Sequence, residues 1–83
     1  MRPIRCAVVG AGHLGKIHAR ILQSFPEFEL SVIVDPSEAA RNLAAETFRV
    51  PVAAEYQDWL DRIDAVIIAA PTKFHYRTAL DFL

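Results

Sequence analysis

The chain has little of several features that mark whole classes of protein. Among its 83 residues there is one cysteine, Cys6, so an intrachain disulfide framework is excluded and a reducing compartment is favoured. This cysteine lies inside an apolar run, which favours a small buried hydrophobe over a reactive thiol. No apolar stretch approaches the roughly 20 residues that span a bilayer. The sequence therefore predicts a soluble, cytoplasmic protein without a membrane partner.

A large excess of charge of either sign is also absent. The formal net charge is −1, from nine basic and ten acidic side chains, and both halves of the chain carry similar balances. Attraction to nucleic acid or to anionic lipid is therefore not indicated. With 53% hydrophobic and 23% charged residues, the composition is that of one globular unit.

Short apolar runs and helical stripes alternate along the chain. The runs at residues 4–9, 30–34 and 65–70 are typical of strands that are buried on both faces. A weaker run at residues 50–54 predicts a short strand, for which Pro51 suggests an irregular or edge position. This alternation predicts an α/β protein with a Rossmann-type, doubly wound parallel sheet covered by helices on both faces.

The intervals between the runs carry helical periodicity. A first helix is expected to begin near Leu14 and to stop at Pro26, and Asp35-Pro36 is a helix-start pattern in which Asp35 would cap the second. A brief helical turn is expected at residues 56–60 and a last helix after Thr72. The faces expected to pack inward are Leu14, Ile17, Ile21, Leu22 and Phe25 in the first helix, and Ala40, Leu43, Ala44, Thr47 and Phe48 in the second.

The end of the chain interrupts this pattern. The last expected helix is cut at its third turn, and a doubly wound nucleotide domain normally has further units after such a fourth strand. Leaving a strand as apolar as residues 65–70 uncovered would also favour aggregation. We therefore expect residues 1–83 to be an incomplete domain of a larger protein, truncated after the fourth strand and its helix.

The stretch VVGAGHLGKIHARIL, residues 8–22, holds all three glycines of the chain in a G-x-G-x-x-G pattern. Such a pattern is weak alone and gains weight when it follows a strand and opens a helix, as it is predicted to do here. Gly10 would allow the tight turn out of the strand, and Gly12 would let a pyrophosphate approach the backbone. Gly15 would let the helix pack closely on the sheet.

Asp35 adds the context that the glycines lack alone. It ends the second predicted strand, and its spacing of roughly 20 residues from Gly15 is that of a ribose-binding acid. Asp35 would accept hydrogen bonds from both ribose hydroxyls and repel a 2′-phosphate, which favours NAD(H) over NADP(H). The amides near His13 and Leu14 would be free donors for the phosphates at a helix N-terminus. Together these features predict a dinucleotide site rather than a structural turn alone.

The histidines after the loop carry different predictions. His18 projects into the apolar arc of the first helix, which favours a buried, hydrogen-bonded packing residue over a catalyst. His75 follows Thr72 by three residues, in a first helical turn at the carboxyl end of a central strand, where open parallel sheets bind ligands. The helix N-terminus would keep its ring neutral. Position alone leaves His75 open between a ligand-site residue and an ordinary first-turn residue.

Three segments together resemble the N-terminal nucleotide domain of the glucose–fructose oxidoreductase / inositol dehydrogenase / MocA (Gfo/Idh/MocA) oxidoreductase family. They are AVVGAGHLGKIHARIL, VIVDP and YQDWLDRIDAVIIAAPTKFHYRTAL, so the resemblance covers essentially the whole chain. The family's stretch D-A-V-x-I-A-x-P-[NT]-x-x-H-x-x-x-A-x-x-x-L is matched at Asp64-Ala65-Val66, Pro71-Thr72, His75, Ala79 and Leu83. The resemblance implies an NAD(P)-binding Rossmann domain at residues 1–83 in which the nicotinamide lies beside Ala70, Pro71, Thr72 and His75.

By the same similarity, the full-length protein is expected to be an oxidoreductase that moves hydride between nicotinamide and a hydroxyl of a sugar, sugar nucleotide or cyclitol. It is also expected to be a homo-oligomer. The family's catalytic lysine, in an E-K-P motif, and its substrate domain would lie beyond Leu83, so no catalytic residue and no metal ligand is nominated here. Lys73 falls at a variable position. The alternatives are a non-catalytic NAD(H)-binding sensor or scaffold protein and an inert truncated fragment.

The loop GHLGKIHARI together with Pro71-Thr72 resembles members that oxidise the 3-hydroxyl of UDP-N-acetylglucosamine-type sugars.

Overall fold

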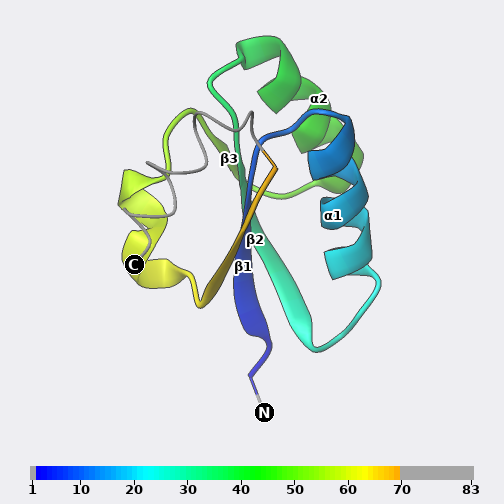
Figure 1. Ribbon diagram of the computed structural model, residues 1–83, viewed down its shortest axis with the longest axis vertical. Coiled ribbons are helices and arrows are strands. Elements are labelled where there is room, and N and C mark those ends of the chain that lie inside the picture. Colours follow the sequence, from blue (N-terminus) through cyan, green and yellow to red (C-terminus); the bar gives the residue numbers. More distant parts are fainter. Residues whose placement is uncertain (1, 70–83) are drawn as a thin grey trace.

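The computed structural model describes residues 2–69, which form a parallel four-stranded sheet in the order β3-β2-β1-β4 (Figure 1). This arrangement confirms the predicted Rossmann-type α/β class. The helix expected after Thr72 lies outside the described residues. In chain order the elements are β1 (Ile4–Val9), α1 (His13–Gln23), β2 (Phe28–Val34), α2 (Glu38–Phe48), β3 (Val52–Ala53), the 3-10 helix η1 (Gln57–Arg62) and β4 (Ala65–Ile68).

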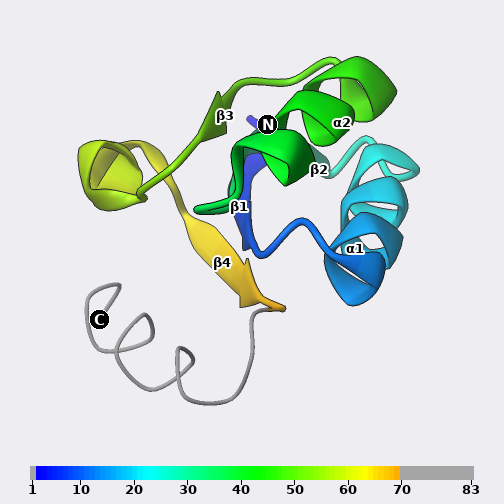
Figure 2. The same ribbon diagram turned by 90° about the horizontal axis from the view of Figure 1, so that it is seen from above.

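The sheet separates two apolar cores. Helices α1 and α2 lie side by side on one face and η1 lies on the other, as Figure 2 shows from above. The last four residues of β1 are buried and alternate between the two cores, so this part of the strand is covered on both faces, as its continuous apolar run predicts. The α-side core is built around Cys6, Val8, Leu22, Leu30, Ile33 and Phe48, and the η1-side core around Ala7, Val9, Val32 and Val34 with Tyr56 and Trp59 packed against them.

The predicted inward face of α1 is wrong in four of its five residues. Gly15, Ala19 and Leu22 face the sheet, and Leu22 is the one residue of the predicted face that is buried. The helix lies too close to the end of β1 for large side chains, because the backbone of Gly10 occupies the space beside Gly15. Small residues therefore meet the sheet. The large ones, Leu14, Ile17, Ile21 and Phe25, are about half exposed.

Helix α2 begins two residues later than a cap at Asp35 would place it. Its N-cap is Ser37, whose hydroxyl accepts a hydrogen bond from the amide of Ala40 at 3.2 Å. Ala44 and Phe48 are buried, as predicted, whereas Leu43 and Thr47 are exposed. The helix packs on β2 and β3 and touches α1 at its side, so its inward face is narrow.

The two outer strands are β3 and β4. The short β3 confirms the edge position that Pro51 suggests, and the carbonyl of Pro51 accepts the amide of Ile33 at 3.1 Å. The apolar run of β4 is only half-buried in the described residues, because β1 is its one neighbour among them. Within residues 2–69, none of the helices has the length and apolarity that crossing a bilayer requires.

An ion pair joins the start of β4 to β1. The guanidinium of Arg5 donates to both carboxylate oxygens of Asp64, at 2.9 and 3.1 Å, and the amide of Arg5 donates to the same carboxylate at 2.9 Å. These bonds lower the pKa of Asp64 from 3.8 to about 2. The pair fixes the residue that precedes β4, and with it the register of this strand on β1.

Replacing Asp64 by asparagine is expected to remove an acid-sensitive contribution to stability. The folded pKa of Asp64 lies below its ordinary value, so the contribution is complete above pH 3.8 and is lost as the pH falls toward 2. Urea unfolding at about pH 6 and about pH 2.5 tests this. The wild-type midpoint should fall more steeply on acidification than that of Asp64→Asn, and parallel pH profiles would contradict the assignment.

Candidate functional site

The glycine loop begins at the end of β1 with a backbone conformation that residues other than glycine rarely adopt. Gly10 has φ of 107°, and its amide donates to the carbonyl of Val34 at 2.7 Å. This bond extends the pairing of β1 with β2 by one residue before the chain turns away. The loop therefore starts at the carboxyl ends of two neighbouring parallel strands, the edge at which open α/β sheets bind ligands.

Gly15 fixes how closely α1 lies against this loop. A Cβ at Gly15 would overlap the carbonyl oxygen of Gly10 and lie 2.8 Å from its carbonyl carbon. Both obstructing atoms belong to the backbone, so a rotamer change of a side chain cannot relieve the overlap. The third glycine of the motif is thus required by packing within the fold itself.

Gly12 has a different environment. It is the N-cap of α1, with φ −75° and ψ −165°, and a Cβ built on it has no atom within 4 Å. Among the described residues no side chain caps this end of α1, and its first turn holds no acidic residue. Within residues 2–69, the first amides of the helix, at His13, Leu14 and Gly15, have no carbonyl acceptor within α1, so they are available as donors. A helix end with these properties is a site for an anion such as a phosphate.

Asp35 is bonded directly to the glycine loop. One carboxylate oxygen accepts the amide of Ala11 at 2.8 Å, and the other accepts the amide of Ser37 at 2.8 Å. The Asp35 side chain thus stabilises two turns, one after each of two strands. Each oxygen retains a further lone pair, so a half-buried carboxylate beside the loop can still accept a ligand hydroxyl.

Sequence reasoning missed the part played by Arg41. Its guanidinium donates to the carbonyls of Asp35 and Pro36, both at 2.9 Å. Arg41 therefore holds the turn that carries the Asp35 carboxylate. The sequence offers one signal for such a contact. Arg41 is a basic residue near the start of a helix that follows the strand-ending Asp35.

The described part of the predicted site comes together at one edge of the sheet. Gly10, Gly12, His13, Leu14, Gly15 and Asp35 lie along the loop and the end of β2. The side chains of His13 and Leu14 are exposed, so these two residues would contribute through their amides. The carboxyl end of β4 joins the same edge, since the amide of Ala69 donates to the carbonyl of Val9 at 2.8 Å. Ala70, Pro71, Thr72 and His75 lie outside the described residues.

His18 and Cys6 lie in or beside the core on the α1 face of the sheet. The prediction that His18 is buried is confirmed only in part, because the residue is half-buried. Cys6 is 2% exposed, and burial raises the pKa of its thiol. A buried thiol of raised pKa carries little thiolate, which agrees with the prediction of an inert core residue.

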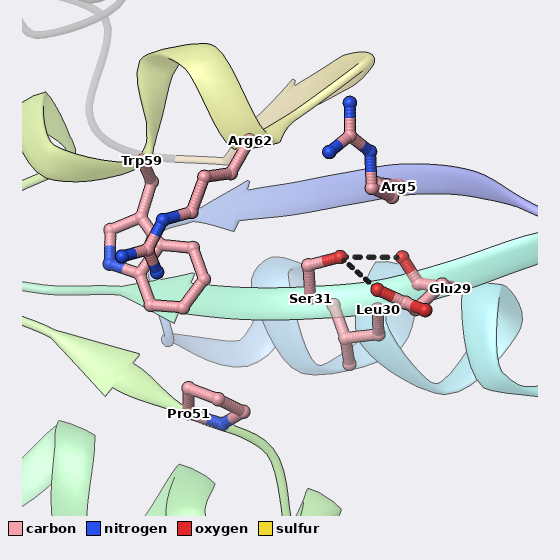
Figure 3. Close-up of a pocket in the computed structure, with 7 residues that line it drawn as sticks. All are labelled: Arg5, Glu29, Leu30, Ser31, Pro51, Trp59 and Arg62. Carbon is pink, nitrogen blue, oxygen red and sulfur yellow. Dashed lines mark hydrogen bonds between the residues drawn. The ribbon is translucent and has the colours of Figure 1, made fainter.

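A hollow of about 470 Å³ lies on the η1 side of the sheet. Residues near the amino ends of β1 and β2, Pro51 and η1 form it (Figure 3). The glycine loop follows the carboxyl end of β1, so the hollow is separate from it. Its polar groups already have partners within the fold. Arg62 stacks on the Trp59 ring at 4.7 Å, and the Ser31 hydroxyl donates to the Glu29 carboxylate at 2.8 Å. Both cationic and anionic side chains line the hollow, so its charges select neither a cationic nor an anionic ligand.

The sequence matches a family model described as an oxidoreductase family with an NAD-binding Rossmann fold, over residues 4–83. The rhizopine catabolism protein MocA of Rhizobium meliloti is 32% identical over 82 residues, which are 98% of this chain and 26% of that protein. The scyllo-inositol 2-dehydrogenase (NAD(+)) of Bacillus subtilis (strain 168) is 37% identical over 78 residues, covering 87% of this chain and 22% of the relative.

Solved structures of dehydrogenases share the fold of this chain. The scyllo-inositol dehydrogenase of Lactobacillus casei, with bound NAD(H) and scyllo-inositol, superposes with a TM-score of 0.85 at 28% identity. The match covers 96% of this chain and 25% of that one. The chain thus spans about a quarter of the length of the relatives and structures that it matches.

Proposed function

This chain belongs to the Gfo/Idh/MocA oxidoreductase family, and we propose that it forms the NAD-binding part of a longer, cytoplasmic dehydrogenase. The dehydrogenase would move hydride between nicotinamide and a hydroxyl-bearing carbon of a sugar, sugar nucleotide or cyclitol. Relatives that carry the names of inositol dehydrogenases support this substrate class. The full-length enzyme would be a homo-oligomer, with the proton-transfer groups in polypeptide outside these 83 residues.

The observation that carries the proposal is the bond between the Asp35 carboxylate and the amide of Ala11. It holds the Asp35 carboxylate, which would accept from a ribose, at a fixed position beside a helix end that has no side-chain cap among residues 2–69 and open space at Gly12. A dinucleotide has matching groups, because its pyrophosphate and adenosine ribose are adjacent. A turn that only joins a strand to a helix does not need an acid held beside free helix amides.

The residues of the loop would bind and orient the cofactor. The amides at the start of α1 would donate to the pyrophosphate, and Asp35 would accept from the ribose hydroxyls. Arg41 would keep Asp35 in place through the carbonyls of its turn. Bound NAD supplies the hydride-accepting nicotinamide. We propose that the segment from Ala70 to His75, which includes Pro71 and Thr72, lies beside that ring.

Calorimetric titration of NAD into the chain tests the binding function directly. Saturable binding together with one cooperative thermal transition is the expected result. A cooperative transition without NAD binding would instead favour an inert fragment. Binding without turnover of any sugar or cyclitol in the longer polypeptide would favour a non-catalytic sensor.

The double substitution Asp35→Ser with Pro36→Arg is expected to shift cofactor preference toward NADP. The change removes a carboxylate that repels the 2′-phosphate and adds a cation that attracts it. The ratio of NADP to NAD affinity should rise at least about tenfold, which corresponds to about 1.4 kcal/mol.

Because Asp35 also holds the amide of Ala11, the thermal midpoint must be measured alongside the affinities. Asp61→Ser removes an exposed acid from η1, away from the loop, and serves as the matched control. An unchanged ratio in a folded double variant would contradict the role of Asp35.

A further inference from the structure

Every polar group of Asp35 is bonded within the fold. Its amide donates to the carbonyl of Ala53 at 3.0 Å, and its carbonyl accepts from the guanidinium of Arg41 at 2.9 Å. Its two carboxylate oxygens accept the amides of Ala11 and Ser37, each at 2.8 Å. The Asp35 carboxylate is therefore a fixed point between the glycine loop and α2, and it does not turn freely in solvent.

The amide of Ala11 depends on this fixed point. Ala11 is 3% exposed, and among residues 2–69 the carboxylate of Asp35 is the acceptor of its amide. A buried amide without an acceptor costs folding free energy, so such groups are almost always bonded. Without the carboxylate, the loop would have to turn at Ala11 until this amide reached water or another acceptor.

The Ala11 amide lies directly before the start of α1. The amide of Gly10 donates to the carbonyl of Val34, and the carbonyl of Gly12 accepts the amide of Lys16 within the helix. Two consecutive loop amides are thus held at the end of β2, and the next residue is the N-cap of α1. A loop that turned at Ala11 would change the direction in which the first amides of α1 meet a ligand.

We propose that Asp35 is a positioning residue for the pyrophosphate of the cofactor as well as the acceptor for its ribose. By holding the Ala11 amide, the carboxylate keeps the loop in the conformation in which the first amides of α1 donate to the phosphates. The inference rests on the function proposed above. It assigns to Asp35 an effect on groups of the cofactor that its side chain does not touch.

Electrostatic repulsion alone predicts the opposite effect. A carboxylate near a phosphate site repels the negative charge of the ligand, so its removal should strengthen phosphate binding. Positioning predicts that its removal weakens phosphate binding. A smaller fraction of the chains would then have the loop in the binding conformation, and the apparent affinity falls by that fraction. The sign of the change therefore separates the two effects.

Two neutral substitutions differ in whether they can hold the Ala11 amide. The hydroxyl of Asp35→Ser can accept the nearby Ser37 amide, as serine does in turns, but it is too short to replace the carboxylate at Ala11. The side chain of Asp35→Asn has the length of aspartate and keeps one acceptor oxygen. Ser37 is exposed, so its amide can bond to water, and the asparagine oxygen is expected to turn to the buried Ala11 amide.

The ligand that isolates the effect is an NAD analogue without the two hydroxyls of the adenosine ribose, here called the deoxy analogue. This ligand cannot donate to the Asp35 carboxylate, so a change in its affinity reports on the rest of the site. Glu38→Gln is the matched control for charge. It removes an exposed acid from the first turn of α2 that makes no bond to the glycine loop.

Calorimetric titration should show that Asp35→Ser binds the deoxy analogue about tenfold more weakly than the wild-type chain. This is the factor expected when one charge-assisted hydrogen bond no longer holds the loop. Asp35→Asn and Glu38→Gln should keep the wild-type affinity for the deoxy analogue. Thermal midpoints of the three variants establish that each is folded at the temperature of the titration.

Equal or tighter binding of the deoxy analogue by folded Asp35→Ser would overturn the proposal and leave Asp35 with a role at the ribose alone. Amide hydrogen exchange of the wild-type chain without ligand is a second measurement, which needs no variant. The Ala11 amide should exchange more slowly than the His13 amide, which has no acceptor within α1. Equal exchange would also overturn the proposal. Failure of the wild-type chain to bind NAD would instead refute the cofactor site itself.

Discussion

Gly15→Ala is expected to lower the thermal midpoint of the chain by about 10–20 °C. The added methyl would overlap the carbonyl of Gly10, and separating them requires α1 to move off the sheet. Overpacking of this kind costs about 1–3 kcal/mol or more when backbone is the obstacle. For a domain of this size each kcal/mol lowers the midpoint by about 4–8 °C. Thermal unfolding followed by circular dichroism measures the loss.

Alanine normally stabilises a helix relative to glycine by about 1 kcal/mol. The sign of the change is therefore diagnostic, since helix propensity alone predicts that Gly15→Ala raises the midpoint. An equal or higher midpoint would show that α1 has room to move away from the Gly10 carbonyl. That result would contradict the conclusion that the Gly10 carbonyl leaves no room for a side chain at position 15.

Gly12→Ala is expected to keep the fold and to weaken NAD binding by about 10- to 100-fold. Its backbone angles suit alanine, and a methyl group there meets no atom within 4 Å. The same methyl would occupy the space through which the pyrophosphate approaches the free amides of α1. Hydrogen bonds to a charged group are worth about 1.5–3 kcal/mol, and losing one accounts for a factor of this size.

Calorimetric titration gives the NAD affinity of Gly12→Ala, and its thermal midpoint provides the control within the same variant. The two glycine substitutions should thus separate stability from binding, with Gly15→Ala affecting mainly the first and Gly12→Ala mainly the second. Unaltered affinity in a folded Gly12→Ala variant would place the phosphates elsewhere and would remove the main support for the loop as a cofactor site.

Most of the main-chain architecture could be predicted from local patterns. The strand at Ile4–Val9 was predicted to the residue, because a continuous apolar run ending at glycine has few other solutions. The short strand near Pro51 was placed correctly at an edge. The glycine motif also placed the start of α1 within one residue.

The contacts of Asp35 could be predicted only in part. Its place at the end of a strand followed from sequence, but the helix cap assigned to it belongs to Ser37. The bond from Ala11 to the Asp35 carboxylate joins residues 24 positions apart. No periodicity reports such a bond, because it depends on β1 and β2 ending side by side.

For residues 2–69, the sequence by itself determined which elements form and their order, and it predicted a glycine loop after one strand and an acid after the next. The tertiary structure alone decided which flank of α1 meets the sheet. Helical periodicity places Leu14, Ile17 and Ile21 on one flank, but it does not say how near the sheet backbone comes. The Gly10 carbonyl sets that distance, and at that distance only residues as small as Gly15 and Ala19 fit against the end of β1. The large side chains are consequently directed outward and remain about half exposed.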